Sequence, residues 1–192
     1  MTHTNFMILF RRLFLLLAFA LILSFAATAQ NTNSTAAPAP KPQVRKPVPL
    51  PAELVSFFSG DWKGTGEFAS GKKIEADASF KVELGNQWLF YRHTDRAPNN
   101  YQVFGTWGFD RESGKFVMLA SDNSGGARLF ISEGWKDGKI VFLKDALLAP
   151  ITFYERFTFE KQSGDVFKMT YESSRDGQQW HLGDYLIFKK TR

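Results

Sequence analysis

Glycine divides the C-terminal three-quarters of this chain into short segments. All 15 glycines lie at or after Gly60, and the stretches between them are rich in Phe, Tyr, Trp, Val, Ile and Thr, which strands favour. Many glycines adjoin a residue that tolerates positive φ, as in Ser113-Gly114 and Asp176-Gly177. Such pairs are typical of hairpin turns. The pattern therefore predicts an all-β domain made of hairpins.

The clearest strand covers residues 74–84, where apolar residues such as Ile74, Ala76 and Phe80 alternate with polar ones. This alternation predicts one buried and one solvated face. The other predicted strands are 62–69, 87–94, 101–109, 115–121, 128–133, 139–143, 151–160, 166–172 and 180–189. One helical turn is predicted over 51–58, where Pro51 suits a helix start and an apolar face can plug one end of the sheet.

About ten short antiparallel strands allow two architectures, a sandwich and a closed barrel. Closure removes the sheet edges that otherwise invite aggregation, so we expect an up-and-down antiparallel barrel. Some strands, such as residues 88–91, are apolar on both faces. End-capping, a flattened barrel and a homodimer contact are three explanations that remain open. A barrel of this size has room for one small ligand.

The first 51 residues have a different composition. Residues 1–29 contain Arg11-Arg12, an apolar run and Ala27-Thr28-Ala29, which is typical of a cleaved export signal. Six of the eight prolines lie in the next segment, residues 30–51, which we expect to be a solvated spacer. The folded domain is predicted over 52–192, in a periplasmic or secreted protein that touches a membrane only through the signal segment, if that segment is uncleaved.

Composition excludes several classes of protein. The chain has no cysteine, which excludes disulfides, thiolate metal sites and a cysteine nucleophile. Five of the 24 basic residues precede Ala52 and all 19 acidic residues follow it, so the domain has 19 of each. A neutral domain lacks the basic surface that nucleic-acid binding requires. No nucleophile elbow, phosphate loop or dinucleotide fingerprint is present, and we expect neither an enzyme nor a resident cofactor.

Short motifs resemble known barrel families. Residues 58–64, Phe-Ser-Gly-Asp-Trp-Lys-Gly, resemble the Gly-x-Trp start of lipocalins and other calycin barrels, and residues 64–67 are similar to the opening of nitrobindin-like barrels. Residues 105–110, 156–159 and 176–180 look like a bacterial calycin-like family of unknown function. The resemblance spans about 54–190. It implies a calycin-like, lipocalin-like barrel.

The resemblance also implies roles for two parts of the chain. Trp62 should close the bottom of the barrel. Lipocalins pack an arginine of the last strand on this tryptophan, and here the end of the chain offers Lys189, Lys190 and Arg192. Nitrobindin-like barrels hold haem through a histidine, and His181 is the nearest match in position. A hydrogen-bonded or surface histidine is the alternative interpretation of both His181 and His93.

The candidate ligand-binding residues are those with polar groups on strand faces that could line an interior: Arg156, Tyr154, Tyr171, Tyr185 and His181. An arginine among tyrosines in an apolar barrel suits a carboxylate or another anion. Alternatively, Arg156 pairs with Glu155, Glu160 or Glu172 outside the barrel, and alternation alone does not decide between the two.

Three functions follow from these observations. The favoured one is binding of a small apolar or amphiphilic ligand inside the barrel. The second is a haem-binding barrel or haem-dependent enzyme that uses His181. The third is an envelope interaction module tethered by the proline-rich spacer. Fold alone does not choose among them.

Overall fold

The computed structural model describes residues 46–146 and 153–191. The predicted signal segment, most of the predicted spacer and the first residues of the predicted strand 151–160 lie outside the described residues. The assignments of residues 1–29 and 30–51 therefore stay predictions. Within the described part of the chain, no helix is long and apolar enough to cross a membrane.

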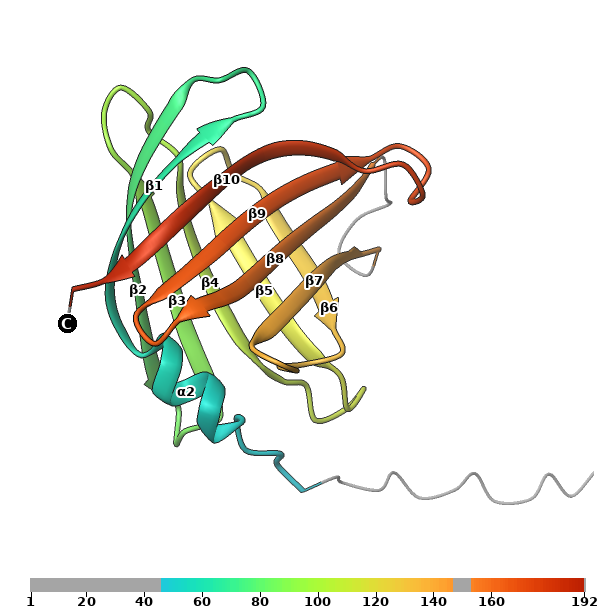
Figure 1. The fold of residues 1–192 in the computed structure, drawn as a ribbon. Coiled ribbons are helices and arrows are strands. Elements are labelled where there is room, and N and C mark those ends of the chain that lie inside the picture. Colours follow the sequence, from blue (N-terminus) through green and yellow to red (C-terminus); the bar gives the residue numbers. More distant parts are fainter. Residues whose placement is uncertain (1–45, 147–152, 192) are drawn as a thin grey trace, which may run out of the picture. The chain divides into compact units, whose positions relative to one another are not determined.

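Ten strands follow one short helix (Figure 1). All ten predicted strands are present, and their observed ends lie within three residues of the expected ones wherever the chain is described. The strands are β1 (Gly60–Phe68), β2 (Lys73–Glu83), β3 (Trp88–Asp95), β4 (Gln102–Phe109), β5 (Phe116–Asp122), β6 (Ala127–Ser132), β7 (Lys139–Asp145), β8 (Tyr154–Ser163), β9 (Val166–Ser174) and β10 (His181–Lys190).

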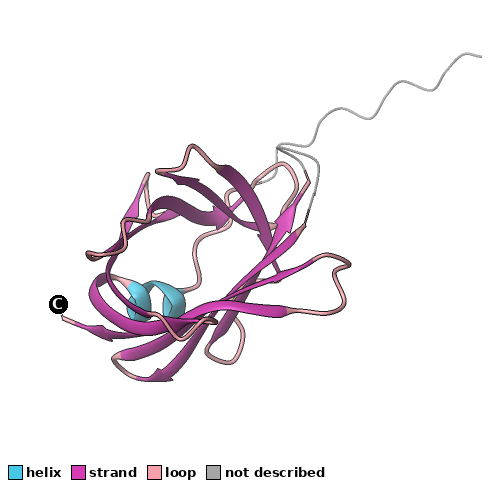
Figure 2. Ribbon diagram, turned by 90° about the horizontal axis from the view of Figure 1, so that it is seen from above, coloured by secondary structure: helices cyan, strands magenta, loops and turns pink. Residues whose placement is uncertain are grey.

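The strands form a closed antiparallel barrel in chain order, and the first strand pairs with the last. At this seam the register runs from Trp62 opposite Lys190 to Phe68 opposite Asp184. Seen along its axis, the strands form a ring with the helix within its outline (Figure 2). The predicted all-β, up-and-down barrel is confirmed, and the sandwich alternative is wrong.

Gly66 allows the two strands of the seam to approach closely. A Cβ atom at this position would lie 1.8 Å from the carbonyl oxygen of Tyr185 on β10. Backbone cannot yield to such an overlap without moving the strand. A residue without a side chain is therefore required where the barrel closes.

Helix α2 (Ala52–Phe58) closes one end of the barrel with Leu54, Phe57 and Phe58, which are buried. The Phe58 ring lies 4.9 Å from the ring of Phe80 and 5.4 Å from that of Trp107, centroid to centroid. These inward-facing rings bury large apolar areas at this end. The predicted plug is confirmed, and Leu50, which precedes the helix and falls in the predicted spacer, is also part of the buried core.

Trp62 lies at the same end and is 1% exposed. Its indole N–H donates a hydrogen bond to the carbonyl of Phe58 at 2.8 Å, which ties β1 to the end of the helix. The ammonium of Lys190 lies 5.2 Å from the centre of the indole and donates to the carbonyl of Phe57 at 2.8 Å. Lys190 thus takes the place that the lipocalin resemblance assigned to an arginine.

The apolar residues 88–91 lie on both faces of β3, and the two faces have different surroundings. Leu89 and Tyr91 point into the barrel and are buried. On the outer face, the rings of Phe90 and Phe104 pair across β3 and β4 at 5.5 Å, with Phe104 37% exposed. Paired outer rings on neighbouring strands explain part of the aromatic excess. The predicted homodimer stays a prediction.

Candidate functional site

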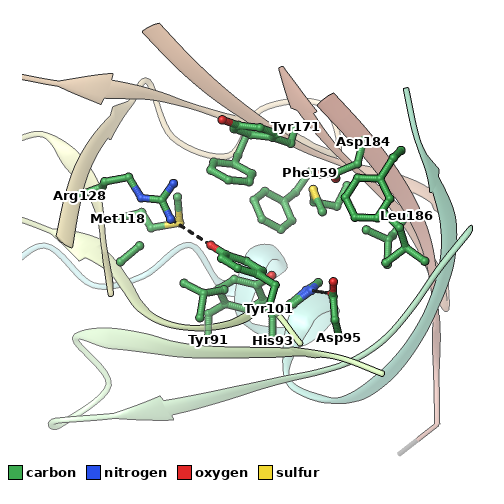
Figure 3. Close-up of a pocket in the computed structure, with 16 residues that line it drawn as sticks. Tyr91, His93, Asp95, Tyr101, Met118, Arg128, Phe159, Tyr171, Asp184 and Leu186 are labelled. Atoms are coloured by element: carbon green, nitrogen blue, oxygen red, sulfur yellow. Dashed lines mark hydrogen bonds and ion pairs between the residues drawn. The ribbon is translucent and has the colours of Figure 1, made fainter. Parts of the chain in front are cut away.

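A cavity of about 320 Å³ occupies the end of the barrel away from α2 (Figure 3). Its volume lies near the lower limit for small-molecule sites, which range from roughly 300 to 1,000 Å³. Residues from nine strands, all but β7, and from the β3–β4 loop line it: Phe68, Ile74, Tyr91, His93, Asp95, Tyr101, Val103, Met118, Ala120, Arg128, Phe157, Phe159, Met169, Tyr171, Asp184 and Leu186.

The interior is filled at the end near α2 and hollow at the other. Near α2, Phe57 and Phe58 of the helix pack against inward rings such as Trp107 and Phe167. Farther along the strands, the inward residues include Ala120 and Val103 beside larger side chains, and space remains between them. The side chains of α2 thus help to fill one end, and the cavity lies at the other.

One polar wall of the cavity is built by His93 and Asp95 at the end of β3. The imidazole Nε2 lies 2.7 Å from Oδ1 of Asp95, and His93 is 3% exposed. In the tautomer with the proton on Nε2, His93 donates this hydrogen bond to the Asp95 carboxylate. The other ring nitrogen, Nδ1, has no hydrogen-bond partner, and in the neutral ring it is an acceptor.

Asp184 on β10 adds a second carboxyl to the wall. Its Oδ1 atom is buried and has no hydrogen-bond partner. Burial raises the pKa of Asp184 from 3.8 to about 6; the nearby Asp95 adds to this rise, and His93 opposes it. Removal from water disfavours the charged form of a carboxyl. Above that pH Asp184 is ionised, and burial of its charge lowers the stability of the folded protein.

The other side of the cavity carries an arginine that already has partners. The Arg128 guanidinium donates to Glu155 at 2.9 Å, to the Tyr101 hydroxyl at 2.9 Å and to Asp122 at 2.6 Å. Figure 3 shows Arg128 and Asp184 on opposite sides of the cavity.

Glu155, which is 2% exposed, is the centre of this group. It also pairs with the Lys144 ammonium at 2.7 Å and accepts a hydrogen bond from the Tyr171 hydroxyl at 3.1 Å. Burial and the neighbouring Glu155 carboxylate raise the pKa of Tyr171, so its hydroxyl remains a donor. Each charge in this group is matched, as buried ion pairs require.

The structure does not bring the five predicted ligand-binding residues together. Tyr171 lines the cavity, whereas Arg156 lies on the outer face of β8. There its Nε donates to Glu172 at 2.7 Å, and its guanidinium lies 4.2 Å from the ring centre of Trp180. The alternative interpretation, an external pair with Glu172, is the one observed.

The other three residues also lie away from the cavity lining. Tyr154 is 38% exposed, and His181, at the start of β10, is exposed. The Tyr185 ring contacts the ammonium of Lys168 at 5.1 Å. The physical reason is which face of each strand turns inward. The inward faces carry Phe157 and Phe159 on β8 and Leu186 and Phe188 on β10. Burying these apolar side chains stabilises the fold more than burying the polar side chains of the opposite faces.

Sequence reasoning missed the polar residues that do line the cavity. His93 and Asp95 share strand parity with buried Leu89 and Tyr91, while Asp184 shares it with Leu186. This alternation is a signal that could have identified them. The sequence-based interpretation of His93 is a hydrogen-bonded or surface histidine, and the predicted strand 87–94 ends one residue before Asp95.

The histidine proposed for haem does not fit that role in this fold. His181 is exposed and is not part of the cavity wall. The cavity histidine, His93, already has Asp95 on its Nε2. Among the described residues, no group of three or more His, Cys, Asp or Glu is placed to hold a metal ion.

Replacing Asp184 with Asn tests its buried charge. The native state holds a proton on Asp184 up to about pH 6, whereas the unfolded chain releases it near 3.8. Stability therefore falls as pH rises between these values, by up to about 3 kcal/mol. We expect Asp184→Asn to be about 1–2 kcal/mol more stable than the parent at pH 8 and equal to it at pH 4, measured by urea unfolding. An equal difference at both pH values would contradict this.

Comparison with known proteins supports the fold. No protein-family model and no curated protein matches the sequence. The crystal structure of Rv2717c from M. tuberculosis is similar, with a TM-score of 0.52 and 14% identity over 74% of this chain and 99% of that one. At this identity the likeness shows a shared fold and nothing more.

Two further solved structures are less similar. A protein of unknown function from the DUF3598 family of Nostoc punctiforme PCC 73102 has a TM-score of 0.46 and 10% identity over 80% of this chain. The match spans 53% of that protein, about half its length. The structure of EF1p2_mFAP2b bound to DFHBI has a TM-score of 0.36 and 10% identity, over 72% of this chain and 96% of that one.

Proposed function

We propose that this chain is an exported, non-catalytic protein, periplasmic or secreted, that binds one small amphiphilic molecule inside its barrel. The observation that carries the proposal is the cavity of about 320 Å³, which lies within a closed sheet and has apolar walls interrupted by a few polar groups. Small-molecule sites have this composition: apolar surface supplies affinity, and a few polar groups set orientation.

The two ends of the barrel support this proposal in different ways. The rings packed around α2 make a rigid base. The hollow end carries buried polar groups, which an apolar core has no need of. The pattern of residues 1–29 supports export. We favour binding over the haem alternative because His181 lies outside the cavity.

The cavity can be tested with a neutral aromatic probe, 2-phenylethanol, and a variant that fills the space. We expect the probe to bind the full-length parent protein in isothermal titration calorimetry and to lose at least tenfold in affinity to Ala120→Phe. Ala120 lines the cavity, whereas Ala127, on the adjacent strand, is exposed. Ala127→Phe is therefore the matched control and should bind like the parent. Equal binding to both variants, or no binding to the parent, would rule out the cavity as the binding site.

A further inference from the structure

We propose that the ligand is an organic cation, an amine on a small apolar body, whose ammonium group binds between Asp184 and His93. This inference rests on the proposed function and specifies the chemical class of its ligand. It differs from the sequence-based expectation, in which an arginine among tyrosines received an anion.

Two polar atoms on one side of the cavity are buried without hydrogen-bond partners: Oδ1 of Asp184 and Nδ1 of His93, a residue that is 3% exposed. Oδ1 accepts hydrogen bonds when Asp184 is ionised, and Nδ1 accepts them when the ring is neutral and donates to Asp95 through Nε2. Leaving such groups unpaired is costly. A ligand that donates several hydrogen bonds would satisfy both atoms, and an ammonium group has up to three N–H donors.

The donors on the opposite side are largely occupied. Both terminal nitrogens of Arg128 donate to protein oxygens, and the Tyr171 hydroxyl donates to Glu155. Nε of Arg128 is the unpartnered donor of this guanidinium. Since Glu155 and Asp122 already balance its positive charge, Arg128 has little attraction left for an anionic ligand.

The charges around the cavity favour a cation. Four carboxyl groups line the cavity or pair with its lining residues: Asp95, Asp122, Glu155 and Asp184. Two permanent cations oppose them, Arg128 and Lys144, and His93 pairs with Asp95, which leaves Asp184 as the carboxyl without a basic partner. A bound carboxylate would add to this excess of negative charge, whereas an ammonium would reduce it.

Aromatic rings complete the environment of a bound cation. Phe68, Tyr91, Phe157 and Tyr171 all line the cavity. The faces of such rings attract cations, and the attraction grows when the site excludes water. The same rings pack against the apolar body of the ligand, so both parts of an arylalkylamine would find complementary surface.

Three probes of similar shape distinguish the charge of the ligand: 2-phenylethylamine, neutral 2-phenylethanol and 3-phenylpropionate. We expect the full-length protein, titrated calorimetrically at pH 8 where Asp184 is ionised, to bind the amine at least tenfold more tightly than the alcohol. The carboxylate should bind more weakly than the alcohol. A carboxylate that binds as tightly as the amine would overturn the proposal.

The Asp184→Asn variant locates the ammonium. We expect it to lose at least tenfold in affinity for the amine and less than twofold for the alcohol. Asp61→Asn is the matched control, because Asp61 is exposed on β1, and it should retain the preference for the amine. An amine preference unchanged in Asp184→Asn would overturn this placement. Binding of the alcohol without any preference for the amine overturns only the cationic ligand, whereas binding of no probe overturns the proposed function as well.

Discussion

Phe58→Ala is expected to lower the free energy of unfolding by about 3–5 kcal/mol, the cost of removing a fully buried phenyl ring. Phe58 is 0% exposed, and its ring lies within 6.3 Å of five other aromatic rings outside its own helix, centroid to centroid. Because these rings come from several strands, they cannot all move to fill the space. Urea unfolding followed by tryptophan fluorescence measures the loss.

Phe104→Ala is the matched control for this substitution. It removes the same ring from the outer face of β4, where Phe104 is 37% exposed. We expect a loss of less than about 1.5 kcal/mol, because part of the ring already contacts water and the outer surface leaves no closed cavity. Losses of similar size in the two variants would show that α2 does not anchor the core.

Glu155→Ala is expected to lower the free energy of unfolding by about 3–5 kcal/mol at pH 7, since it removes one partner of a buried ion pair. Without Glu155, the Lys144 ammonium, whose side chain is 12% exposed, loses its carboxylate, and the Tyr171 hydroxyl loses its acceptor. The Arg128 guanidinium keeps Asp122 and Tyr101. Urea unfolding of parent and variant at low and high salt measures the change.

Glu160→Ala removes a glutamate from an exposed pair on the same strand and serves as the control. Its carboxylate lies 3.3 Å from the Lys139 ammonium, and both side chains are more than 40% exposed. Exposed pairs contribute about 0–1 kcal/mol and are weakened by salt. If Glu155→Ala proved as mild as Glu160→Ala, the buried group around Glu155 would not be a structural requirement of the cavity wall.

The strands of the barrel were predictable because they depend on local patterns. Alternation in residues 74–84 marks β2, and a glycine beside Asp137 or Asp176 marks a hairpin. Chain connectivity then favours pairing between consecutive strands. The seam between β1 and β10 is a long-range contact. No local sequence pattern predicts that the backbones of Gly66 and Tyr185 approach each other closely there.

The orientation of the strands explains the errors in the predicted site. For β8, alternation defines one face with Tyr154 and Arg156 and another with Glu155 and Phe157. Choosing the first face placed an arginine in the cavity, but the phenylalanines of the second face gain more from burial. The sequence does not show that Arg128 and Lys144, on β6 and β7, compensate the charge of Glu155 and so permit its burial.

The all-β class, the approximate strand boundaries and the plug at residues 51–58 are predictable from the amino-acid order, because each depends on neighbouring residues along the chain. Which end of the barrel is hollow, and which polar groups face the cavity, is known only from the folded barrel. Those properties depend on how side chains from different strands fill a shared volume and balance one another's charges. Asp184 and His93 come from strands far apart in the sequence, and they line one cavity only because the sheet closes.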